Sequence, residues 1–99
     1  MHTKRDLLEI VAKPDGNQAH YTEATVSAAL ELLFPEERRP EAQENLDVFY
    51  TGDHPRIKLA ILLLSDGDTN KVAEYGEAAN KDYRDVLYWV ELRLNEMND

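Results

Sequence analysis

The run Ile57–Leu64 constrains the fold more than any other stretch, because it is apolar on nearly every side. Periodicity alone does not separate a buried strand from a buried helix in so short a run. Its composition favours a helix, since it holds four Leu and one Ala but no Val or Thr. We therefore predict a helix over about residues 55–65, with Asp53 as its N-terminal cap and Gly67 just beyond its end.

This helix should lie at the centre of the molecule. A helix that is apolar around most of its circumference is buried by several neighbours. Only Lys58 and Ser65 form a narrow polar strip, which we expect to face water. The run falls far short of the roughly 20 apolar residues of a membrane-spanning helix. The helix is therefore predicted to be scaffold, and Ile61→Asp to unfold the protein.

Five other segments repeat apolar side chains with a period near 3.6 residues, and no segment alternates convincingly with a period of two. They predict helices over residues 4–13, 23–34, 40–50, 70–80 and 83–97, with a single turn at 35–39. Capping residues stand before four of them: Thr3, Thr22, Asp68 or Thr69, and Asp82. The expected fold is all-α, a compact bundle of five to six short helices around the central one, in a single domain over residues 1–99.

Two glycines carry specific expectations. Gly52 follows the predicted helix 40–50 and is expected to end it with a positive φ. Gly76 lies on the apolar stripe of the helix 70–80, where a glycine costs about 1 kcal/mol relative to alanine. We therefore expect the backbone of another helix to approach Gly76 closely.

Composition and charge exclude several functions. The net charge is −9, and the acidic residues are spread along the chain. Nucleic-acid binding and docking on anionic membranes need Lys and Arg to neutralise phosphates, so neither is expected. There is no cysteine, which excludes disulfides, thiolate catalysis and zinc–thiolate sites. With no signal peptide recognised at the N-terminus, we expect a cytoplasmic protein.

Metal and catalytic signatures are weak. Asp66, Asp68 and Asn70 have the 1, 3, 5 spacing of a calcium loop, and Glu77 falls at position 12. Position 6 requires a glycine but holds Lys71, so these residues are interpreted as the end of one helix and the start of the next.

The histidines His2, His20 and His54 form no recognisable metal motif, and a pH-sensing or catalytic role for His54 has no partner visible in the sequence. Nucleophile motifs and glycine-rich phosphate loops are absent. We therefore predict no catalytic residue, no metal and no cofactor, and we expect that the chain is not an enzyme.

The back of the last helix is the most informative surface. Tyr88 and Leu92 are spaced i, i+4 and lie opposite the core stripe, while Trp89 lies at its edge with Arg93 one turn on, able to stack on the indole. Two large apolar groups there indicate either a second contact within the monomer or an interface with a partner, where Tyr and Trp are enriched. The candidate interaction surface is Tyr88, Trp89, Leu92 and Arg93.

Three functional hypotheses remain open from the sequence. The first is an adaptor or regulatory module that binds another protein or a second copy of itself. The second is an acidic antagonist that mimics a polyanion in a basic groove, which predicts carboxylates in rows on one face. The third is a small-molecule binder or an enzyme, with Tyr50, His54 and Tyr75 lining a pocket if they converge.

Overall fold

The computed structural model describes residues 3–12 and 22–97, which form six α-helices and one 3-10 turn, with no strand among them. The elements, in chain order, are α1 (Lys4–Ala12), α2 (Glu23–Leu33), η2 (Glu36–Arg38), α3 (Arg39–Phe49), α4 (Pro55–Ser65), α5 (Thr69–Lys81) and α6 (Tyr83–Met97). The all-α class and the single turn between α2 and α3 are confirmed. The radius of gyration, 12.2 Å, is close to the value of about 13 Å typical of a folded chain of this length.

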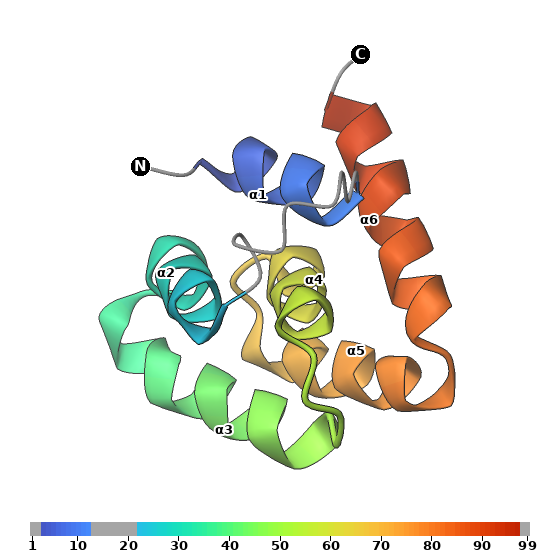
Figure 1. Cartoon of the computed structure of the whole chain (residues 1–99). Helices are drawn as coiled ribbons and strands as arrows, with labels where there is room; N and C mark the ends of the chain where they lie inside the picture. Colours follow the sequence, from blue (N-terminus) through green and yellow to red (C-terminus); the bar gives the residue numbers. More distant parts are fainter. Residues whose placement is uncertain (1–2, 13–21, 98–99) are drawn as a thin grey trace.

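Helix α4 is the axis of the bundle, as its apolar circumference predicts. It packs against α1, α2, α5 and α6, which surround it in Figure 1. Every residue from Leu59 to Leu64 is buried. Deleting or charging a side chain here would leave a cavity or an unpaired charge in contact with several helices at once.

The predicted N-terminal caps are confirmed at four helices. Thr3 and Asp6 bond reciprocally at the start of α1, each side chain accepting the other residue's backbone N–H at 3.1 Å. Thr22, Asp68 and Asp82 each accept a backbone N–H from one of the next three residues, at 3.3, 2.9 and 3.0 Å. These bonds satisfy N–H groups that a helix leaves without a partner in its first turn.

The cap predicted for α4 is wrong. His54, not Asp53, is the N-cap residue, and it makes no side-chain capping bond. Asp53 is exposed, with its carboxylate 3.8 Å from the Lys58 ammonium. The other end of α4 follows the prediction: Asp66 and Gly67 both have positive φ, 51° and 89°, and they turn the chain into α5.

Gly52 does not have the positive φ expected of it; among the described glycines only Gly67 does. Helix α3 already ends at Phe49, and Tyr50 is extended. The side chain of Tyr50 folds back over Gly52, where an added Cβ would overlap the phenol ring. The absence of a side chain at position 52 is thus explained by the space that the Tyr50 ring occupies.

The polar strip of α4 is only partly at the surface. Ser65 is buried, contrary to the prediction, and its hydroxyl donates to the Ile61 carbonyl at 2.7 Å. A serine that bonds the carbonyl four residues earlier satisfies its own polar group and needs no water. Lys58 is partly buried and reaches the surface to pair with Glu23, 3.0 Å away.

A candidate interaction site on the outer face of α6

Helix α6 is amphipathic, but its outer face is not wholly polar. Val86, Val90 and Leu94 are buried against the rest of the bundle. On the opposite side, Tyr88 and Leu92 are 57% and 42% exposed. They are one turn apart and therefore neighbours on the helix surface. Two large apolar side chains thus form a short exposed stripe in the part of the chain that the structure describes.

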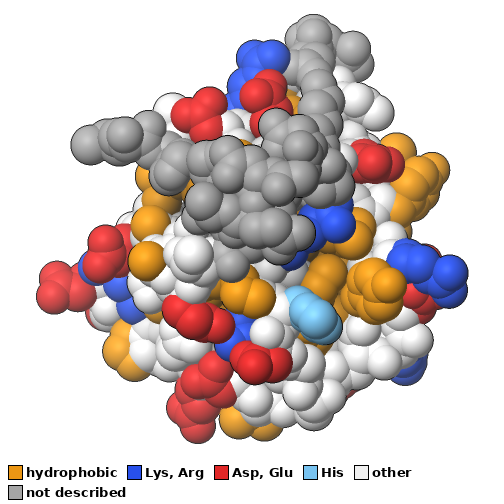
Figure 2. All heavy atoms as spheres, in the orientation of Figure 1, with side chains coloured by type: hydrophobic (Ala, Val, Ile, Leu, Met, Phe, Trp, Pro, Cys, Tyr) orange, Lys and Arg blue, Asp and Glu red, His pale blue; other side chains and the backbone are white. Residues whose placement is uncertain are grey.

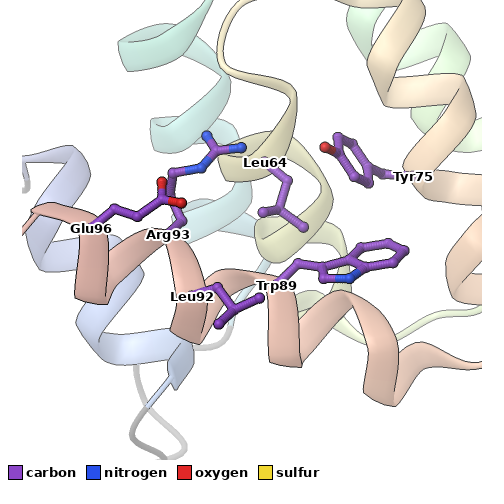
Figure 3. A pocket seen from close by; sticks show the side chains of 6 residues that line it. All are labelled: Leu64, Tyr75, Trp89, Leu92, Arg93 and Glu96. Carbon is purple, nitrogen blue, oxygen red and sulfur yellow. The ribbon is translucent and has the colours of Figure 1, made fainter.

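Beside this stripe lies a hollow of about 320 Å³ between α5 and α6. Leu64 of α4 lies at its base, and Tyr75 of α5 and Trp89 of α6 form one side, as Figure 3 shows. Leu92, Arg93 and Glu96 complete the lining. Three helices therefore meet at one mainly apolar depression, continuous with the exposed stripe through Leu92.

The side of the hollow is formed by an aromatic pair. The rings of Tyr75 and Trp89 lie edge to face, with centroids 5.8 Å apart and planes at 61°. Both are half-buried and pack against the core. Such a pair contributes about 0.5–1.5 kcal/mol beyond its buried area. The hollow therefore has a side that packing holds in place before any ligand arrives.

The structure brings together three of the four residues predicted for the interaction surface. Trp89, Leu92 and Arg93 line the hollow, whereas Tyr88 does not line it and stands exposed beside it. Arg93 does not stack on Trp89, because its guanidinium points away from the indole (Figure 3).

Two of the lining residues, Leu64 and Glu96, are not predicted by any sequence pattern, and Tyr75 was expected in a different pocket, with Tyr50 and His54. Leu64 was interpreted as scaffold only, yet the central helix supplies the base of the hollow. The only signal for Tyr75 was its place on the apolar stripe of α5, which does not reveal that α5 lies beside α6.

Three exposed carboxylates flank the exposed stripe: Asp85, Glu91 and Glu96. None of the three makes an ion pair with another described residue. Two cations lie nearby on the same helix: Arg84 is held by Asp82 at 3.0 Å, and Arg93 lines the hollow with Glu96. The hydrogen bond between Arg84 and Asp82 lowers the pKa of Asp82 and raises the pKa of Arg84. The outer face of α6 therefore combines an apolar stripe with an excess of negative charge.

A second, smaller hollow of about 230 Å³ lies where α4 and α6 begin, lined by His54, Arg56, Ile57, Tyr83 and Leu87. Figure 2 shows hydrophobic side chains next to a histidine on that face, with acidic side chains spread widely around them. The Arg56 guanidinium is already engaged, because it donates to the carbonyl of Val11 from two nitrogens.

Neither of these two hollows brings together the three residues predicted to line an enzyme or ligand pocket. His54 lines the smaller hollow and Tyr75 the larger one. Tyr50 is buried beside His54, and burial raises the pKa of its phenol despite a hydrogen bond with the His54 backbone. A convergent set of titratable groups, as a catalytic cleft requires, is therefore not formed by these three.

The residues with calcium-loop spacing have structural roles. Asp66 ends α4 and pairs with Lys4, Asp68 caps α5, and Glu77 lies within α5. Within residues 3–12 and 22–97, no three His, Asp or Glu side chains gather closely enough to hold a metal ion. His2 and His20 lie outside the described residues.

No protein-family model, no curated protein and no solved structure matches this chain. In the described part of the chain, none of the helices has both the length and the apolar character required to cross a membrane.

Proposed function

We propose that this chain is a protein-interaction module that binds another protein through the outer face of α6. The proposal rests on one observation: Tyr88 and Leu92 expose large apolar side chains beside a preformed hollow built over Leu64. Tyrosine and tryptophan are enriched where interfaces gain most of their binding energy. A solvent-exposed helix face has no structural need for such residues.

The charge of the chain supports a protein as the partner. With 20 acidic and 11 basic side chains, the surface repels phosphates and anionic lipid headgroups. Isolated apolar residues on a surface are ordinary, and Leu32 and Val48 are examples on α2 and α3. What distinguishes the α6 face is that its apolar residues adjoin each other and a hollow.

The test compares two double variants with the wild-type chain. Tyr88→Ala/Leu92→Ala removes the stripe, and Leu32→Ala/Val48→Ala removes two other exposed apolar side chains elsewhere on the surface. Because all four side chains are exposed, the free energy of unfolding of each variant should differ from that of the wild type by no more than about 0.5 kcal/mol per substituted site. Loss of folding in the α6 variant would mean that the stripe is a structural element.

Each protein is then used to capture partners from the source cell, and captured candidates are purified and titrated individually. We expect the α6 variant to weaken the affinity for a direct partner by about tenfold or more, and the α2/α3 variant to leave it unchanged. Partners whose dissociation constants are the same for all three proteins would refute an interface on α6.

A further inference from the structure

We infer that the segment bound on the outer face of α6 is a basic amphipathic helix that places one large apolar side chain in the hollow over Leu64. This inference rests on the proposed function and specifies the chemistry of its partner. It is carried by the shape of the apolar surface and by the charges around it.

The shape suits a helix rather than an extended peptide. The exposed backbone groups of a sheet edge, which an extended peptide would use, are absent from this all-helical site. The stripe instead offers Tyr88 and Leu92 one turn apart, followed by the hollow beside Leu92. A bound helix presents apolar side chains at i, i+3 or i+4, and i+7 with the same repeat of about 5.4 Å per turn.

The hollow is suited to an apolar anchor. Leu64 at its base is only 2% exposed, and the Tyr75–Trp89 pair is fixed by packing on the core. An anchor that enters it needs little rearrangement of this chain, which lowers the entropic cost of binding. Arg93 and Glu96, at the rim, are placed to bond the polar atoms of an incoming segment.

The charges select a basic partner. Asp85, Glu91 and Glu96 are exposed, and none of them makes an ion pair with a described residue. They outnumber Arg93, the neighbouring cation that Asp82 does not hold. Lys or Arg flanking the apolar anchors of a partner helix would meet these carboxylates at the rim of the contact. Such complementarity raises association rates and disfavours acidic competitors.

The same charges disfavour a second copy of this chain as the occupant. In a two-fold dimer, the same surface patch is used by both subunits. Asp85, Glu91 and Glu96 of one subunit would then share the interface with the same three carboxylates of the other, in a molecule that already carries a net charge of −9. Like charges brought together at an interface cost binding energy, whereas a basic helix would neutralise them.

The experiment selects binders from a displayed library of random peptides, each long enough for about four helical turns. Enriched sequences are synthesised without tryptophan and titrated against the protein. Trp89 is the only tryptophan of the chain and lines the hollow, so its fluorescence reports occupancy directly. We expect enriched peptides to carry net positive charge with apolar residues at helical spacing.

Three variants separate the contributions. Tyr88→Ala/Leu92→Ala should weaken binding by about tenfold or more, and the control Leu32→Ala/Val48→Ala should not. Asp85→Asn/Glu96→Gln should weaken binding of basic peptides by about threefold or more, and raising the salt from about 50 to 500 mM should weaken it further.

The outcomes distinguish this inference from the proposed function. Enriched peptides could be neutral or acidic, or their affinity could be insensitive to salt, while the Tyr88→Ala/Leu92→Ala variant no longer binds them. That result would contradict a basic helix as the partner but would support the α6 interface. The same conclusion would follow if the wild-type chain sediments as a dimer and the Tyr88→Ala/Leu92→Ala variant sediments as a monomer. Peptides whose affinity is the same for the wild type and the Tyr88→Ala/Leu92→Ala variant would contradict both the proposed function and the basic-helix inference. A library that yields no binder would contradict the inference.

Discussion

Gly76 of α5 lies directly against the backbone of Phe49 in α3. A Cβ added to Gly76 would stand 3.1 Å from the Phe49 carbonyl carbon and 3.2 Å from the Tyr50 nitrogen. The two helices run side by side in the same direction, with Asn45 beside Thr69 at one end and Asn80 beside Phe49 at the other. The close approach predicted from the position of Gly76 on its apolar stripe is confirmed, and it sets the distance between α3 and α5.

Gly76→Leu is expected to destabilise the protein by about 1–3 kcal/mol or more, because the side chain must displace the Phe49 backbone. Gly76→Ala should cost less, since the gain in helix propensity of about 1 kcal/mol offsets part of the strain. Urea unfolding followed by circular dichroism measures both. Glu77→Leu, on the exposed face of α5, is the control and should shift the free energy of unfolding by no more than about 0.5 kcal/mol.

Ile61→Asp is expected to abolish cooperative unfolding. Ile61 has no exposed surface and lies in the helix that the rest of the bundle surrounds. An unpaired carboxylate there would cost several kcal/mol, comparable to the whole stability of a domain of this size. Ile61→Val, the control, should cost only about 0.5–1.5 kcal/mol. A sharp thermal transition for Ile61→Asp at the wild-type temperature would contradict the central role of α4.

The ion pair of Lys58 with Glu23 predicts a pH dependence. Partial burial of Lys58 would by itself lower its pKa, but the hydrogen bond and charge of Glu23, together with Asp53, outweigh burial, and the pKa is raised above its usual 10.5. The folded state therefore holds this proton more tightly than the unfolded chain. The stabilisation is fully present below about pH 10.5 and is lost as the pH rises through the raised value.

Lys58→Met should accordingly lower the free energy of unfolding by about 1 kcal/mol or less near pH 8, since Glu23 is 65% exposed and solvent screens the pair. The difference from wild type should shrink above about pH 10.5. Lys71→Met is the matched control, because Lys71 is exposed and makes no ion pair with the described residues. A Lys58 effect that persists unchanged at high pH would show that lost packing of the stem, not charge, is responsible.

Periodicity and capping residues were sufficient to predict the helices because both act within a few residues of sequence. Thr22 and Asp68 cap helices whichever neighbours those helices acquire. The errors arose at side-chain contacts that neither periodicity nor capping describes. Ser65 was assigned to water because it is polar, but its hydroxyl bonds the Ile61 carbonyl within α4. Gly52 was assigned a positive φ, although the ring of Tyr50 explains its small size.

Of the candidate site, only the part that lies on a single helix could be predicted from the sequence. The spacing of Tyr88 and Leu92 identified an apolar stripe on α6 without knowledge of any other element. The hollow beside the stripe depends on which helices adjoin α6, and Leu64 and Tyr75 come from two of them. No local pattern records that neighbourhood, because residues that meet across the bundle are separated by long stretches of sequence.

Arg56 is expected to hold α1 on the bundle. Its guanidinium donates to the Val11 carbonyl from Nε at 3.1 Å and from Nη2 at 2.6 Å. This carbonyl lies in the last turn of α1, where helices leave carbonyl groups unpaired and where a cation is favoured. Arg56→Met keeps much of the aliphatic stem and removes the donors, so it should lower the free energy of unfolding by about 1–3 kcal/mol. Hydrogen exchange should locate the loss: amides of α1 should exchange faster in the variant, while those of α5 should change only as much as global stability does. Equal acceleration of both helices would instead make Arg56 a contributor to the whole fold rather than the residue that docks α1.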